Sequence, residues 1–140
     1  MLQSFIDAGV NLDSQNINGY TALMMALEFD FHYSIIKLLI KSNCNLNLQC
    51  KFGWTALVYA SIYSDLETVK LLIKKGTNIY IRTNANQSLY ELSEDNKIKK
   101  YLNEFVMFQV WKIREQSKNY MKNAFSVYNI MSNVFLFFAT

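Results

Sequence analysis

The 140-residue chain has no proline, only four glycines, two cysteines and a single histidine. Proline and glycine interrupt helices most strongly, so their scarcity favours a mostly helical fold and excludes collagen-like and proline-rich architectures. Two cysteines cannot build a disulfide framework or supply all four ligands of a zinc site. This low cysteine content favours a reducing, intracellular and cytoplasmic location.

Charge is also scarce and nearly balanced. The chain is 51% hydrophobic and 18% charged, and 14 basic against 11 acidic residues give a net charge of +3. Such a composition is too apolar for intrinsic disorder and lacks the clustered basic footprint of a nucleic-acid-binding protein. Only two of the basic residues are arginine, which leaves few side chains for bidentate recognition of phosphates or bases. We therefore expect no nucleic-acid partner.

One block of sequence recurs along the chain at a nearly constant spacing. Residues 19–23 read GYTAL and residues 53–57 read GWTAL, while IKLLIK at 36–41 returns as VKLLIK at 69–74. A decayed third copy begins at Asn86, and a partial copy opens the chain. A period of about 33 residues indicates structural repeats, and these must stack because no single copy can bury its own apolar face.

Each copy predicts a helix, a loop, a second helix and an extended turn. Thr55 precedes the first helix of the second full copy and is expected to cap it through its hydroxyl oxygen, and Asp65 precedes the second helix. Gly76 follows two lysines and suits the left-handed position that ends a helix. Val69 and Leu72 lie on the apolar stripe of the second helix, so we expect them to be buried between repeats.

Residues 53–79, GWTALVYASIYSDLETVKLLIKKGTNI, resemble the ankyrin repeat. Alanine replaces the proline of the family pattern at Ala22 and Ala56, and Met24 and Val58 replace its histidine. The resemblance implies that the hydrogen bonds which this histidine makes between repeats are lost. The composition, which is rich in Asn, Ile and Lys, also resembles that of the ankyrin proteins of giant DNA viruses, although AT-rich codons alone would give the same composition.

The resemblance implies an all-α ankyrin solenoid of helix-loop-helix units with extended turns, followed by C-terminal helices. It also implies a non-catalytic module that binds another protein. The alternatives are a truncated or decayed ankyrin product without activity, and a membrane-associated adaptor that uses residues 120–140. The predicted parts are a partial repeat at 1–16, repeats at 17–50 and 51–83, a degenerate repeat at 84–102, and a helical extension at 103–140.

In ankyrin domains, partners usually bind the turn tips and the inner face of the first helices. Aromatic side chains at such rigid, exposed positions are typical of binding hot spots. Trp54 is expected to be partly accessible, because the core positions are filled by other side chains. The alternative is that the C-terminal segment folds over this surface. The protein-binding residues implied by the resemblance are Tyr20, Phe29, Phe52, Trp54, Ile62 and Tyr63.

Nothing in the sequence proposes a catalytic, cofactor or metal site. His32 lies in an inter-helix loop without a visible partner, so we interpret it as a solvated histidine. Cys44 and Cys50 are interpreted as free thiols of a loop, and the scattered glycines form no phosphate-binding loop.

The last forty residues do not follow the repeat period of about 33 residues. A helix is expected from about Lys97 to Gln116, then a weak break at 117–119 and an amphipathic helix. A capping helix is the favoured interpretation, because the uncharged stretch at 124–140 is shorter than the roughly 20 residues that span a membrane. Surface or anchored membrane contact and partial disorder are the alternatives. The apolar stripe of the last helix is predicted to comprise Met121, Ala124, Phe125, Tyr128, Met131, Phe135 and Phe138.

At the opposite end, residues 1–6 supply barely one helical turn, and the helix that should precede them is missing. The first full repeat is therefore expected to expose an apolar edge. Either the chain is a fragment of a longer ankyrin protein, or another molecule covers that edge.

Overall fold

A computed structural model describes the backbone of residues 1–119 and 124–139. All regular structure in these two ranges is helical, and the chain divides into two units, residues 1–94 and 95–140. The helices are α1 (Leu2–Asp7), α2 (Ala22–Glu28), α3 (Tyr33–Lys41), α4 (Ala56–Tyr63), α5 (Leu66–Lys74), α6 (Leu89–Leu92), α7 (Asn96–Asn119) and α8 (Ala124–Phe138).

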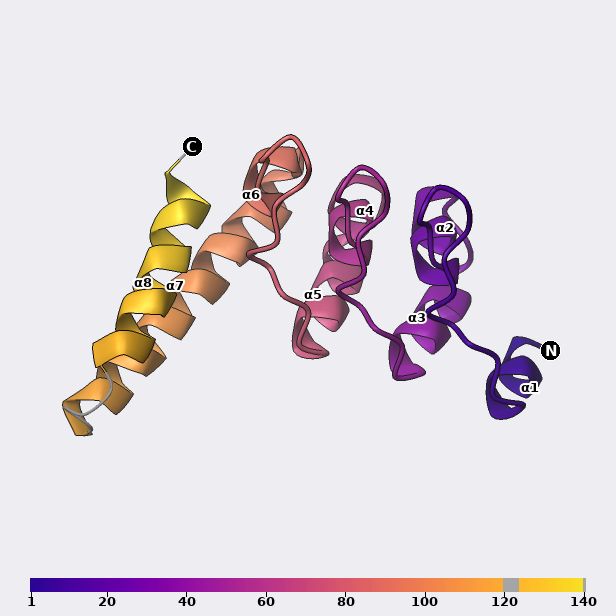
Figure 1. The fold of residues 1–140 in the computed structure, drawn as a ribbon, viewed down its shortest axis with the longest axis horizontal. Helices are drawn as coiled ribbons and strands as arrows, with labels where there is room; N and C mark the ends of the chain where they lie inside the picture. The colour runs from indigo at the N-terminus through magenta and orange to yellow at the C-terminus, as the bar shows by residue number, and fades with distance from the viewer. Residues whose placement is uncertain (120–123, 140) are drawn as a thin grey trace. The chain divides into compact units, whose positions relative to one another are not determined.

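The first unit is a row of stacked helix pairs (Figure 1). Helix α2 packs against α4, and α4 packs against α6, so these three form one row, which we call the inner helices. Helices α3 and α5 contact each other in a second row, and each also packs on the inner helix of its own repeat. The predicted all-α solenoid of stacked helix pairs is confirmed.

Side-chain caps fix the start of most repeat helices. The Thr21 hydroxyl accepts a hydrogen bond from the Met24 amide at 3.3 Å, and the Asp65 carboxylate accepts one from the Thr68 amide at 2.9 Å. The predicted hydroxyl cap at Thr55 is wrong. The amide of Val58 donates to the backbone carbonyl of Thr55 at 3.0 Å instead.

The core lies between the rows of the first unit. Val69 and Leu72 are fully buried, as the apolar stripe predicted, and Gly76 has the expected left-handed conformation with φ +87°. Cys50 is a free thiol in a loop, as predicted, but its side chain is buried with Sγ 3.5 Å from the Tyr59 hydroxyl. Cys44 is half-buried, and its thiol donates to a backbone carbonyl.

The second unit consists of α7 and α8, which pack against each other. Helix α7 confirms the predicted helix, but the predicted break at 117–119 is wrong, because the helix runs to Asn119. Ser117 does not disrupt the helix, since its hydroxyl donates to the Arg114 carbonyl at 2.9 Å. The predicted boundary after residue 102 falls within α7 and stays a prediction.

The predicted apolar stripe of α8 is wrong over its described part. Phe135 is 71% exposed and Met131 and Phe138 are also exposed, whereas the neighbouring Phe137 is buried. Residues 134–138 are all apolar, so periodicity could not select the buried face there. Met121 lies outside the described residues, and the side chains of residues 124–128 are not described. Among the described helices, none is long and apolar enough to cross a membrane.

Candidate binding surface

Three turns with the same backbone hydrogen bonds precede the inner helices. The amide of residue 16 donates to the carbonyl of residue 20, residue 50 donates to residue 54, and residue 83 donates to residue 87, all at 3.0–3.1 Å. Each turn needs one left-handed residue, and Gly19, Gly53 and Asn86 supply it with φ of +80°, +79° and +60°. These turns hold Tyr20 and Trp54 in fixed positions immediately before their helices.

Adjacent turns approach each other too closely for a side chain at the glycines. A Cβ atom on Gly53 would lie 2.5 Å from the Asn84 amide nitrogen, and one on Gly19 would lie 2.9 Å from the Cα of Cys50. Asn86 occupies the same position in the third turn and carries a side chain, which an asparagine tolerates in this conformation. The sequence showed that glycine is lost at position 86, but it could not show that Asn86 adopts the same left-handed conformation.

Polar side chains connect the repeats in the absence of the family's histidine. Asp13 accepts a hydrogen bond from the Asn45 amide at 2.6 Å, and Asn47 accepts one from the Asn78 amide at 2.8 Å. These two bonds are equivalent, because Asp13 and Asn47 occupy the same position in consecutive repeats. Sequence reasoning missed these two bonds, although the recurrence of Asp13 and Asn47 at the spacing of the repeat was a usable signal.

A second set of bonds runs beside the first. Gln15 donates to the carbonyl of Gln49 at 3.0 Å, and Gln49 donates to the carbonyl of Arg82 at 3.0 Å. Each glutamine also donates to the glycine carbonyl of its own turn, at 2.6 Å for Gly19 and 2.7 Å for Gly53. One amide group therefore fixes both the shape of a turn and its distance from the next turn.

Three of the predicted binding residues meet around a fourth aromatic residue. The ring centroids of Tyr20, Trp54 and Tyr63 lie 5.6, 5.3 and 6.3 Å from that of Tyr59, which is 1% exposed. Tyr20 and Trp54 are half-buried and Tyr63 is exposed, so Tyr59 supports a partly exposed aromatic surface. Sequence reasoning named the three outer residues and missed Tyr59. We call these four residues the aromatic cluster.

The other three predicted residues lie elsewhere. Phe52 is 59% exposed at the tip of the second turn, where its carbonyl accepts a hydrogen bond from the Asn84 amide at 3.1 Å. Phe29 is exposed at the C-terminal end of α2, and Ile62 is half-buried on α4. All three remain candidate contacts, but no ring contact joins either phenylalanine to the aromatic cluster among the contacts of the described residues.

The Tyr59 phenol and the Cys44 thiol both have raised pKa values. Burial raises the pKa of the Tyr59 phenol well above its usual value, and hydrogen bonds to Tyr20 and Cys50 raise it further. Burial is also the main cause that raises the pKa of the Cys44 thiol, with the Asp13 carboxylate as the second cause. Both groups are therefore neutral near pH 7, and neither is an activated acid, base or nucleophile.

The described residues offer little for metal binding. Nowhere in residues 1–119 and 124–139 do three His, Cys, Asp or Glu side chains gather closely enough to hold an ion. His32 is exposed as predicted, but it also caps α3: its Nδ1 lies 2.8 Å from the Ser34 hydroxyl and 3.4 Å from the Ser34 amide. That local role explains the histidine without a ligand.

Comparison with known families agrees with the stacked helix pairs and their turns. The model of ankyrin repeats in three copies matches residues 1–83. The chain therefore belongs to the ankyrin repeat family, whose members are generally protein-interaction modules and typically non-catalytic.

Three curated relatives are each much longer than this chain. An ankyrin repeat protein of Acanthamoeba polyphaga mimivirus is 42% identical over 72 residues, which are 48% of this chain and 13% of the relative. Alpha-latrotoxin-Lg1a of Latrodectus geometricus is 29% identical over 122 residues, 85% of this chain and 9% of the toxin. Mouse ankyrin repeat and SAM domain-containing protein 6 is 30% identical over 78 residues, 55% of this chain and 9% of that protein.

Among solved structures, the ankyrin repeat domain of Bcl-3 is similar, with a TM-score of 0.67 and 24% sequence identity. The match covers 73% of this chain and 45% of that domain. At this level of identity the likeness shows the fold alone. It agrees with the row of inner helices described above.

Proposed function

We propose that the chain is a non-catalytic protein–protein interaction module whose binding surface is the aromatic cluster together with the turn tip at Phe52. The observation that carries this proposal is the support of Tyr20, Trp54 and Tyr63 by one fully buried aromatic residue. Large aromatic side chains that stay partly exposed on a rigid base are typical of binding hot spots.

Rigidity supports the same proposal. The turns that carry Tyr20 and Trp54 are fixed by their own backbone bonds and by the glutamine side chains between repeats. A surface that is ordered before binding loses little conformational entropy when a partner binds, which favours affinity. The intact bonds between repeats also favour a working module over a decayed product.

The mimivirus relative supports a viral origin and a host protein as the partner. Both statements belong to the proposal, since the chain spans 9 to 13% of the relatives' own lengths. Phe29 and Ile62 are proposed as peripheral contacts of the same surface.

The test compares two tyrosines of similar exposure. Tyr63 on the inner helix α4 is 46% exposed, and Tyr33 on α3 is 43% exposed. A tagged full chain captures its partner from host-cell lysate, and the affinity of the purified pair is then measured. Trp54→Ala and Tyr63→Ala should each weaken binding by about 2 kcal/mol, roughly thirtyfold, whereas Tyr33→Ala should change it little. Equal losses for Tyr63→Ala and Tyr33→Ala, or unchanged binding by Trp54→Ala, would contradict the proposal.

A further inference from the structure

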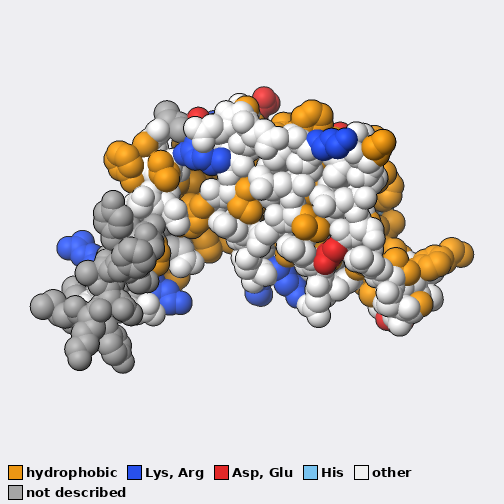
Figure 2. Space-filling model, viewed as in Figure 1, with side chains coloured by type: hydrophobic (Ala, Val, Ile, Leu, Met, Phe, Trp, Pro, Cys, Tyr) orange, Lys and Arg blue, Asp and Glu red, His pale blue; other side chains and the backbone are white. Residues whose placement is uncertain are grey.

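Both helices of the second unit expose apolar side chains, but α7 combines them with charge. Helix α8 has no charged residue, and it exposes Phe135 and Leu136 near its C-terminal end, where Figure 2 shows hydrophobic side chains in orange. On α7, Met107, Phe108 and Trp111 are 59%, 55% and 56% exposed. We call these three residues the α7 patch. Lysine and arginine residues flank the α7 patch along the same helix, so this surface is both apolar and basic.

The α7 patch lies opposite the buried stripe of its helix. Ile98, Leu102 and Val106 are fully buried and follow each other at intervals of about one helical turn. Trp111 follows Leu102 by nine residues, which is about two and a half turns, so the two side chains point to opposite sides of α7. The rings of Phe108 and Trp111 stack with their centroids 5.9 Å apart. The α7 patch is therefore a paired aromatic surface that the packing of α7 does not use.

Two basic residues lie on the same face as the α7 patch. Lys100, Met107 and Arg114 are spaced by nearly two helical turns, so one line along α7 carries a basic, an apolar and a second basic side chain. Both basic residues are exposed. Lys100 lies 4.0 Å from the Glu104 carboxylate, but these side chains are 78% and 65% exposed, and such a pair contributes little to stability. Both cations therefore remain available to a negatively charged partner.

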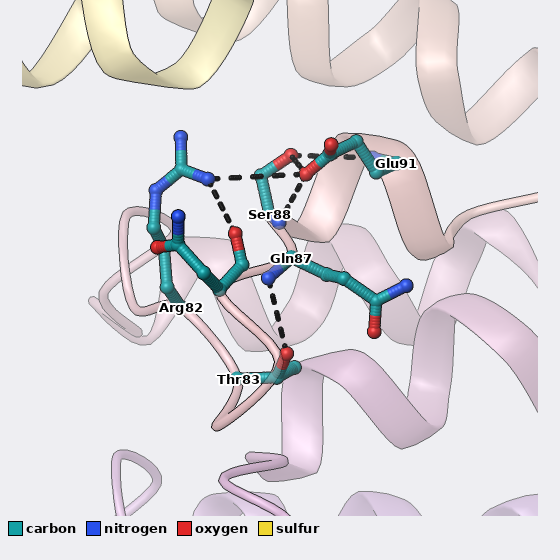
Figure 3. A network of polar contacts seen from close by, with 6 residues as sticks. Arg82, Thr83, Gln87, Ser88 and Glu91 are labelled. Atoms are coloured by element: carbon teal, nitrogen blue, oxygen red, sulfur yellow. Dashed lines mark hydrogen bonds and ion pairs between the residues drawn. The ribbon is translucent and has the colours of Figure 1, made fainter. Parts of the chain in front are cut away.

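The positive charge of the chain is concentrated in the second unit. Residues 95–140 contain seven Lys or Arg and three Asp or Glu, a net charge of +4, whereas residues 1–94 contain seven and eight, a net charge of −1. Arg82 of the first unit is also held within its own repeat: its Nη1 donates to the Asn86 carbonyl at 2.7 Å and lies 3.9 Å from the Glu91 carboxylate (Figure 3). The α7 patch thus belongs to the unit that an anionic surface attracts.

We propose that the α7 patch binds the surface of an anionic phospholipid bilayer, with α7 lying along that surface. Trp111, Phe108 and Met107 enter the boundary between headgroups and acyl chains, where tryptophan is favoured because its ring is apolar and its N–H is polar. Lys100 and Arg114 bind lipid phosphates on either side of the patch. Helices that combine exposed aromatic residues with Lys and Arg bind lipid surfaces in this way. The like charge of two second units argues against a second copy of the chain as the occupant.

The test follows the fluorescence of Trp111 in the full chain, with Trp54→Phe to remove the other tryptophan. Vesicles of phosphatidylcholine with about 30% phosphatidylserine are titrated into the protein at low salt. The proposal expects a saturable blue shift of the emission, and binding that is roughly tenfold weaker at about 1 M salt. Polyglutamate has the negative charge but no apolar interior, so it should give no blue shift. No shift with the vesicles, or an equal shift with polyglutamate, overturns the proposal.

A matched pair of phenylalanines separates insertion of the α7 patch from the general attraction of a basic protein. Phe108 on α7 and Phe5 on α1 are both 55% exposed. In cosedimentation with the same vesicles, Phe108→Ser should weaken binding roughly tenfold, because a buried ring is lost, whereas Phe5→Ser should change it little. The double variant Lys100→Gln, Arg114→Gln should also weaken binding and reduce its dependence on salt. Equal losses for the two phenylalanine variants overturn the proposed face.

Two measurements without lipid test whether the α7 patch is occupied in solution. Phe108→Ser should leave the Tm unchanged, because the ring is exposed, and a clear fall in Tm would place the patch in a packed interface and overturn the proposal. Sedimentation tests the rival occupant. A dimer that Phe108→Ser dissociates would make a second copy the partner and overturn the proposal, whereas a monomer that binds the vesicles supports it.

Discussion

Helices α2 and α4 occupy equivalent places in consecutive repeats, yet their environments differ. Helix α4 has an inner helix on both sides and buries six consecutive residues, 56–61. Among the principal helix contacts, α2 contacts another inner helix only on the side of α4. Its Ala22 and Met25 are exposed. The comparison shows that the place of a repeat in the stack, and not its local sequence, decides which of its residues form the core.

The largest effect on stability is expected for the buried tyrosine of α4, compared with the exposed residue at the same position of α2. Tyr59→Ala removes a fully buried ring and should lower the free energy of unfolding by about 3–5 kcal/mol, because a cavity remains where Tyr20, Trp54 and Tyr63 met. Met25→Ala, at the equivalent exposed position, should cost about 1 kcal/mol or less. Urea unfolding of both variants measures the difference. Similar losses would show that α2 is covered in the same way as α4.

The next prediction concerns two glycines with the same backbone conformation. Gly53 and Gly76 have φ of +79° and +87°, but only at Gly53 would an added Cβ meet the neighbouring turn, 2.5 Å from the Asn84 nitrogen. Gly76→Ala should therefore cost about 1–2 kcal/mol from conformation alone. Gly53→Ala should cost roughly 1–3 kcal/mol more, because adjacent turns must separate. Thermal unfolding compares the two, and equal costs would contradict close stacking of the turns.

The repeat period made the first unit predictable. A pattern that returns once in every repeat identifies equivalent positions, so Val69 and Leu72 could be assigned to the core and Trp54 to a partly exposed turn. Periodicity identifies a position within a repeat but does not say what lies against it. Tyr59 was missed for that reason: its burial depends on Tyr20, which belongs to the preceding repeat.

Other features depend on contacts that one sequence does not display. The bonds from Asp13 and Asn47 join backbone and side chain across repeats, and asparagines in turns usually bond locally instead. In α8 the apolar run at 134–138 has no polar residue to mark the outer face, so the predicted stripe left out the buried Phe137. Within the candidate site, the residue types were predictable, whereas their grouping around one buried ring required the structure.

The smallest effect on stability is expected for a single hydrogen bond between two repeats. Asn47 lies between two repeats and accepts from the Asn78 amide at 2.8 Å, whereas Asn11 accepts only from the Asp13 amide of its own turn among the described contacts. Asn47→Ala should lower the free energy of unfolding by about 1 kcal/mol, the usual net contribution of such a bond. Asn47→Asp should retain the stability, because Asp13 already performs the equivalent role one repeat earlier. Hydrogen exchange at the Asn78 amide provides the site-specific measurement: protection should fall in Asn47→Ala and persist in both Asn47→Asp and Asn11→Ala. Unchanged protection in Asn47→Ala would remove this side chain from the connection between repeats.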